Sequence, residues 1–94
     1  MNLAIVIGKV VEWSSRPAGK SWVFNFIVAT ENPQTQKHDY VRCYQFRSKD
    51  EWYWDNGTDI CVEGTVRTSS YENKSGERIW ETKIEAKKIL KLSN

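Results

Sequence analysis

The chain has little of what catalysis, metal binding and cross-linking require. It contains a single histidine, His38, in a polar stretch with no partner that suggests a catalytic pair or triad. Its two cysteines, Cys43 and Cys61, have neither a metal-ligand spacing nor a disulfide pattern. We therefore predict no enzymatic activity, no metal and no cofactor. Both cysteines fall in strand-like runs where a small reduced thiol can be buried, which indicates a cytoplasmic setting.

Long apolar runs and strong charge are also missing. No apolar stretch is long enough to span a membrane and no signal peptide is visible, so we expect no membrane association. The formal net charge of +2 does not by itself indicate a nucleic-acid partner, although it permits a local basic face. The 94 residues are enough for one domain, residues 1–94, with one modest core.

Runs of β-branched and aromatic residues predict five strands, over residues 3–11, 22–30, 40–46, 59–68 and 78–92. In the second run, Phe24, Phe26 and Val28 share the face that we expect to form the core. The connecting stretches 12–21 and 31–39 are polar or rich in turn residues, and we predict loops there. Gly8 and Gly64 are candidates for bulges or bends, and the alternation of faces in the last run breaks near Lys87 and Lys88.

One segment predicts a helix. Ser48 followed by Glu51 makes a capping box, and Asn56 with Gly57 makes a C-terminal stop, so residues 48–57 are expected to form about two helical turns. One or two of its three aromatic residues, 52–54, are expected to plug the end of a barrel. Three strands, a short helix and two strands is the order of a five-stranded OB-fold barrel, an all-β fold with a long hairpin between strands four and five.

Aromatic residues are plentiful: they make up 13% of the chain and include five Trp residues. A core of this size does not easily bury five indoles, so we expect some rings to be exposed for binding. The third run alternates between a small apolar face (Val41, Cys43, Gln45) and a larger face of rings and one guanidinium. If the larger face were the core, its arginine would be a buried charge. We therefore expect it to be an exposed stripe of four residues: Tyr40, Arg42, Tyr44 and Phe46.

The hairpin over residues 60–86, with its tip at Asn73 and Gly76, carries further rings and cations on or near the tip. Rings stack on exposed bases and cations pair with phosphates, which favours a single-stranded nucleic acid as the ligand. The hairpin alone also allows ordinary cross-strand pairs on a solvated surface. The hairpin candidates, with one phosphate contact on the first strand, are Arg67, Tyr71, Lys74, Arg78, Trp80 and Lys9.

The sequence resembles the bacterial and phage single-stranded DNA-binding protein family across nearly its whole length. The resemblance is in four ordered segments: Val-Ile-Gly-Lys-Val at 6–10, Val-Phe-Asn-Phe-Ile-Val-Ala-Thr at 23–30, Tyr-Val-Arg through Phe at 40–46, and Val-Glu-Gly-Thr-Val-Arg-Thr at 62–68. It implies that Tyr40, Phe46 and Tyr71 stack on bases, that Trp80 occupies an aromatic position, and that arginines 42 and 67 contact the backbone.

The resemblance also implies that subunits pair through the first strand. The run from Leu3 to Val11 is apolar on both faces, which independently suggests that one face meets a partner chain, so a homodimer or homotetramer is expected. The family's acidic tail, which recruits replication proteins, is not seen in this sequence, as in the similar tail-less primosomal replication protein n. Replication proteins therefore stay open as partners without such a recruiting tail, and we expect a bacterial, phage or plasmid origin.

The function predicted from these features is binding of single-stranded DNA with little sequence preference, in replication, recombination or repair. Two alternatives remain open at this point. The exposed rings could form a protein-docking surface of a primosome-type OB module in replication restart, or the domain could bind single-stranded RNA.

Overall fold

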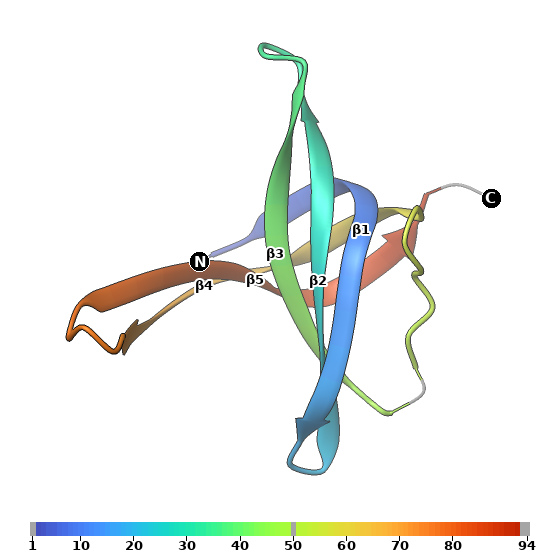
Figure 1. Cartoon of the computed structure of the whole chain (residues 1–94). Helices are drawn as coiled ribbons and strands as arrows, with labels where there is room; N and C mark the ends of the chain where they lie inside the picture. Colours follow the sequence, from blue (N-terminus) through green and yellow to red (C-terminus); the bar gives the residue numbers. More distant parts are fainter. Residues whose placement is uncertain (1, 50, 93–94) are drawn as a thin grey trace.

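The computed structural model of the chain describes residues 2–49 and 51–92; Met1, Asp50, Ser93 and Asn94 lie outside the described residues. The strands are β1 (Ala4–Ala18), β2 (Ser21–Asn32), β3 (Lys37–Arg47), β4 (Asp59–Glu72) and β5 (Arg78–Lys91). They form a closed barrel in the order β1-β2-β3-β5-β4 (Figure 1). Neighbours are antiparallel except β3 and β5, which pair in parallel over only two positions. The predicted all-β OB-fold order is confirmed.

Two predicted loops are largely strand. β1 continues to Ala18 and turns through Gly19, whose φ is 65°, and β2 and β3 extend until only residues 33–36 separate them. Beyond Glu12, β1 pairs with β2 alone, so Pro17 lies on an edge where its missing N–H interrupts no second ladder. The prediction of loops over the whole of 12–21 and 31–39 was therefore wrong, and two long hairpins project from the barrel instead.

The predicted helix is also wrong for the described part of residues 48–57, which excludes Asp50. This segment is irregular chain between β3 and β4, on the right in Figure 1, with turn hydrogen bonds from Glu51 N to the Ser48 carbonyl and from Thr58 N to the Asp55 carbonyl. Gly57 N donates to the Val10 carbonyl at 2.7 Å, which ties the segment to β1. Trp52 and Trp54 both pack against the core, while Tyr53 between them is 65% exposed. Burying two indoles at spacing two outweighs the local capping signals, and the predicted barrel plug is confirmed.

Apolar side chains from every strand fill the barrel. Phe24, Phe26 and Val28 of β2 are at most 2% exposed, which confirms the predicted core face. The core also includes Cys43 of β3 and Ile84 of β5, which face one another across the short parallel pairing. No charged side chain among the described residues is buried. The polar chemistry of the chain is therefore on its surface.

Gly8 lies where β1 changes partner. β1 pairs with β4 up to Lys9 and with β2 from Lys9 onward. A change of partner at Gly8 agrees with the prediction that β1 bends there to serve two sheets. The register shift itself lies between Val10 and Glu12. At Gly64 the ladder does shift, since β5 skips one residue between Ala86 and Lys88. The predicted bulge at Gly64 and the irregularity near Lys87 are thus confirmed.

We expect Gly8→Ala to destabilise the barrel by at least about 1–3 kcal/mol, the usual cost of overpacking. A Cβ atom there would lie 2.2 Å from the Ala29 carbonyl oxygen, so β1 and β2 would have to separate at their crossing. Guanidinium unfolding measures the loss. The control is Gly19→Asn, where a Cβ meets nothing within 4 Å and asparagine tolerates the positive φ. Equal stabilities of the Gly8 variant and the wild type would contradict the close crossing.

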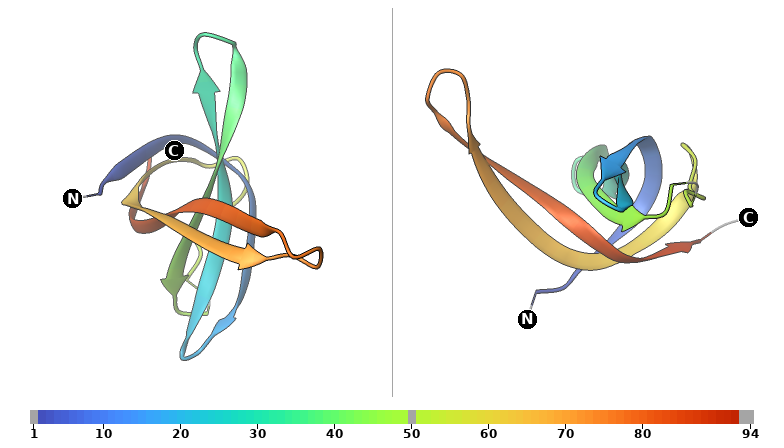
Figure 2. Two further views of the ribbon diagram at one scale, coloured as in Figure 1. Left: turned by 90° about the vertical axis from the view of Figure 1, so that its left-hand side faces the viewer. Right: turned by 90° about the horizontal axis from the view of Figure 1, so that it is seen from below.

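The β4–β5 hairpin extends well beyond the barrel as a curved two-stranded arm, as both views of Figure 2 show. Its tip is built as predicted. Asn73 Oδ1 accepts hydrogen bonds from the amides of Ser75 and Glu77 at 3.0 and 2.9 Å, and Gly76 has a φ of 81°. An asparagine side chain that bonds the backbone ahead of it is a common way to close such a turn. The arm stands beside the outer face of the β1-β2-β3 sheet.

Candidate nucleic-acid interface

The stripe on β3 faces outward. Tyr40 and Phe46 are 66% and 54% exposed, whereas Cys43 between them is 1% exposed. Arg42 is exposed and Tyr44 is half-buried, with its ring edge-on to that of Phe46 at 5.9 Å between centroids. The prediction that this face is exposed and the opposite face buried is confirmed. Three rings and one guanidinium thus follow one strand across the surface.

Three hollows lie along this stripe, between the β1-β2-β3 sheet and the β4–β5 arm. The central hollow, of about 500 Å³, is bordered by polar side chains of β1 and β2 and by Arg42 and Lys83. The Phe46 hollow, of about 230 Å³, is bordered by Phe46, Tyr44 and Arg67 among others. The Trp80 hollow, of about 400 Å³, lies between Tyr40 of β3 and Trp80 of β5. Rings therefore line the two end hollows.

Cations stand where the hollows join. Arg42 borders both the Trp80 hollow and the central hollow. Arg16 of β1 and Lys83 of β5 border both the central hollow and the Phe46 hollow, together with Asn25. Within the described part of the chain, Arg16 and Arg42 have no carboxylate within 4 Å, and Lys83 Nζ is 3.9 Å from Glu81. The hollows make one path with rings at its ends and cations between them.

The arm divides the predicted hairpin residues between its two faces. The register places Arg67 opposite Lys83 and Tyr71 opposite Ile79, all on the face that borders the Phe46 hollow. Trp80, 68% exposed, is on the other face, beside Tyr40. Three further placements complete the set: Tyr71 is 50% exposed, Arg78 is exposed on the face of Trp80, and Lys74 is exposed at the tip.

Arg67 is partly neutralised within the protein. Its Nε donates to Glu85 Oε1 at 3.0 Å, and Lys87 Nζ lies 3.1 Å from the other carboxylate oxygen. Hydrogen bonds from Lys87 and then Arg67 lower the pKa of Glu85 below its usual range. Glu85 is therefore ionised at neutral pH, and it loses its stabilising effect only as the pH falls through that lowered value. Arg42 has no such partner among the described residues and is the more available cation for a phosphate.

Lys9 is not part of this path. Its Nζ lies 3.2 Å from Asp59 Oδ1 and donates to the Gly57 carbonyl at 3.3 Å. Lys9 pairs with Ala29 of β2, which in turn pairs with Tyr40 of β3, so Lys9 is on the same outer face of the sheet as Tyr40 but borders none of the three hollows. The other predicted site residues lie on the stripe or on the arm.

Sequence reasoning missed Arg16 and Lys83. Arg16 was assigned to a loop, because Pro17 next to it hides the continuation of β1. Lys83 lies in the predicted last strand, but the parallel pairing of β3 with β5 that brings its face beside Arg42 has no local signal in the sequence. One clue was available in the sequence. When the register of the β4–β5 hairpin is counted from its tip, Lys83 pairs with Arg67 and therefore lies on the same face of the arm.

A second surface is apolar. Leu3, Ile5 and Ile7 are 66%, 56% and 59% exposed, on the side of the chain opposite Val6 and Val10, which pack in the core. Cys61 of β4 pairs with Ile7, and Leu90 of β5, 45% exposed, pairs with Cys61. We call these five residues the apolar face. Exposed apolar side chains grouped over three strands indicate an interaction surface.

The two free thiols differ sharply in environment. Burial raises the pKa of Cys43 to about 12, whereas Cys61 is half-buried on the apolar face. We expect Cys43 to stay unlabelled by a maleimide in the folded protein at pH 8, because the thiolate is the reactive form. Mass spectrometry of labelled peptides checks this, with guanidinium-unfolded protein as the control. Labelling of Cys43 at the unfolded rate would contradict its burial.

Comparison with known proteins agrees with this geometry. The single-strand binding protein family matches residues 1–92. The chain therefore belongs to the single-strand binding protein family. Within the part of the chain that the structure describes, no helix is long and apolar enough to cross a membrane, and no group of three or more potential ligands forms a metal site.

Two curated relatives are similar at low identity. A single-stranded DNA-binding protein of Halalkalibacterium halodurans is 26% identical over 100 residues, covering 95% of this chain and 59% of the relative. Single-stranded DNA-binding protein 3 of Listeria innocua is 28% identical over 100 residues, covering 95% of this chain and 62% of the relative. The chain spans about three fifths of the length of these relatives.

Two solved structures share the fold. The mitochondrial single-stranded DNA binding protein Rim1 of S. cerevisiae has a TM-score of 0.77 at 15% identity, covering 98% of this chain and 95% of that one. The dimeric N-terminal domain of PriB from Thermoanaerobacter tencongensis has a TM-score of 0.71 at 24% identity, covering 99% and 98%. At these identities the likeness shows the fold alone, which is the OB-fold barrel.

Proposed function

We propose that residues 1–94 form one OB-fold domain that binds single-stranded DNA with little sequence preference, in DNA replication, recombination or repair. The observation that supports this most directly is the path of three hollows, with rings at both ends and cations at the joins. Flat rings accept any base, and cations hold the phosphates between them. The names of the curated relatives, which are single-stranded DNA-binding proteins, point to the same ligand.

The proposed mechanism is stoichiometric binding without turnover. Each barrel holds roughly 4–16 nucleotides, and each base stacked on a ring contributes on the order of 1–3 kcal/mol. Phosphates pair with Arg42 on the path and with Arg67, Lys74 and Arg78 of the arm. We place the protein in the cytoplasm, where both thiols stay reduced.

The test is a fluorescence titration with oligo(dT), oligo(U) and duplex DNA of equal length. We expect oligo(dT) to quench tryptophan fluorescence, through Trp80 on the exposed arm, and added salt to reverse the quenching. Duplex DNA should bind far more weakly, because its bases cannot reach the rings. No quenching by oligo(dT) at low salt would overturn the proposal, and tighter binding of oligo(U) would replace DNA by RNA as the ligand.

We propose further that the protein is a homo-oligomer that pairs through the apolar face. A second copy is the occupant whose chemistry matches, because a two-fold axis brings the same apolar side chains against one another. The PriB domain that shares this fold was described as dimeric. None of the five residues of the apolar face borders a hollow, so pairing through this face is compatible with DNA on the binding path. Recruitment of other replication proteins is not assigned to any described surface.

A further inference from the structure

We infer that the central hollow holds the sugar-phosphate backbone of the strand rather than a base, and that Arg16 and Lys83 clamp the phosphates there. This inference rests on the proposed function. It assigns a binding role to two residues on opposite sides of the path, from β1 and from β5. It also divides the path by chemistry: bases stack at its two ends, and the backbone passes between two cations in the middle.

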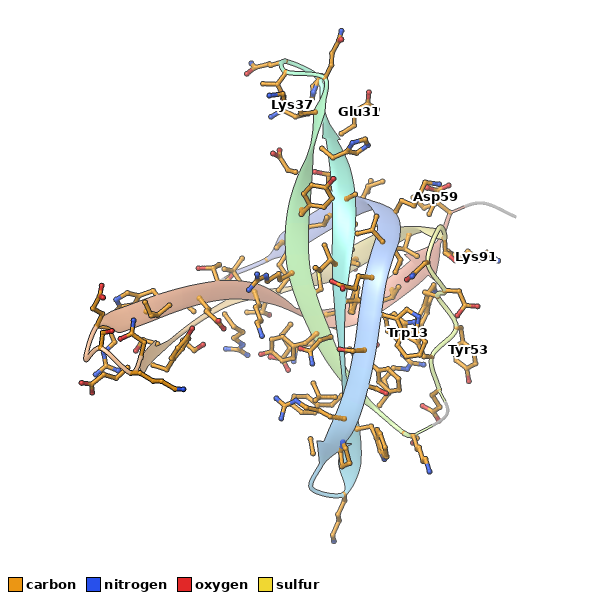
Figure 3. All side chains as sticks on the ribbon, viewed as in Figure 1. Trp13, Glu31, Lys37, Tyr53, Asp59 and Lys91 are labelled. Carbon is orange, nitrogen blue, oxygen red and sulfur yellow. The ribbon has the colours of Figure 1, made fainter. Side chains whose placement is uncertain are left out.

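The first observation is that the central hollow offers a base less ring surface than the two end hollows do. Two aromatic residues border it, Trp13 and Phe26, and both rings pack on Trp52, with centroid separations of 5.6 and 5.0 Å. Phe26 is 2% exposed and Trp13 is 37% exposed, against 54–68% for Tyr40, Phe46 and Trp80 in the end hollows. Figure 3 shows Trp13 directed toward the segment that includes Tyr53, away from the β4–β5 arm. A base in this hollow would therefore gain less stacking energy than a base at either end.

The second observation is that the rest of the border of the central hollow is polar except for Ile27 and Cys43, and bears more positive than negative charge. Three cations border it, against one carboxylate, that of Glu12. Arg16 is exposed and has no ion-pair partner among the described residues, and Lys83 is only weakly paired, at 3.9 Å from Glu81. Phosphate oxygens are the part of a nucleotide that suits such a border.

The third observation is position. Arg16 and Lys83 are the two cations that border the central hollow and the Phe46 hollow alike. A strand whose bases stack at both ends of the path has to cross this join. Cations on both sides of it can hold consecutive phosphates while the base between them points outward or toward Asn25, which is the third residue at the join.

The first test measures salt dependence. Arg16→Gln and Lys83→Gln should each reduce the log–log salt slope of oligo(dT) affinity by about 0.7, and the double variant by about 1.4, since each lost phosphate contact removes that amount. Arg16→Lys should restore the slope, because it keeps the charge. The matched control is Lys37→Gln, at the tip of the β2–β3 hairpin (Figure 3), which should leave the slope unchanged.

The second test alters the DNA. With an oligonucleotide of the shortest length that binds, one abasic site near its middle should be tolerated, whereas a neutral methylphosphonate linkage at the same place should weaken binding. Two results would overturn the proposed phosphate clamp. One is a double variant with the same salt slope as the wild type, and the other is an abasic site that weakens binding more than the methylphosphonate linkage does. Those results still leave the wild-type protein binding DNA, whereas failure of the wild type to bind would overturn the proposed function as well.

Discussion

Replacing Tyr40 and Phe46 together by alanine should weaken oligo(dT) binding by at least about thirty-fold, because each stacked base is worth on the order of 1–3 kcal/mol. Both rings are more than half exposed and contribute little to the core, so the fold should remain intact. They line opposite ends of the binding path, so each substitution removes a separate stack. A filter-binding titration at fixed salt measures the loss.

The salt dependence of the same double variant should be unchanged, because no phosphate contact is removed. The matched control is Tyr53→Ala. Tyr53 is 65% exposed, almost as much as Tyr40 at 66%, but it lies in the segment between β3 and β4, off the path. Equal affinities of the double variant and the control would show that the stripe does not stack on bases, whatever else binds DNA.

A single charge on the apolar face should separate the subunits. In a two-fold pair Ile7→Glu buries two carboxylates, and at about 3–5 kcal/mol for each uncompensated buried charge the dissociation constant should rise by roughly four orders of magnitude. Light scattering should then report the 11.0 kDa chain instead of a multiple of it. The affinity of each barrel for a short oligonucleotide should be retained, since Ile7 does not border the hollows.

Cys61 provides a second readout of the same pairing. It lies opposite Ile7 and is half-buried within one chain, so a partner should slow its reaction with a maleimide and Ile7→Glu should restore the rate. Ser15→Glu, which adds the same charge to an exposed position of β1 outside the apolar face, serves as the control. A wild-type protein that is already monomeric at high concentration would contradict pairing through this face.

Strand alternation predicted much of the fold and of the exposed surface. The pattern of β3, with rings and Arg42 on one face and Cys43 on the other, is visible without coordinates because a buried arginine is costly. The hairpin tip at Asn73 and the irregularity at Gly64 are equally local features. In each case the signal and the structure that it determines lie within a few residues of each other.

What the sequence could not predict depends on distant contacts. β1 continues past Pro17 because it is an edge strand there, and edge position is a property of the sheet. The capping signals at Ser48 and Gly57 were outweighed by burial of two indoles. Arg16 and Lys83 lie 67 positions apart and meet only because the barrel closes through β3 and β5. Lys9 was included for its charge; its Nζ lies 3.2 Å from Asp59 Oδ1, and its contact with a phosphate stays a prediction.

The most direct test of the binding path is an NMR titration of the ¹⁵N-labelled protein with oligo(dT). We expect the amide signals that move to belong to residues bordering the three hollows, above all those of β3 between Tyr40 and Phe46 and those around Lys83. Movements confined to the segment between β3 and β4 or to the apolar face, with the β3 signals unchanged, would contradict the path.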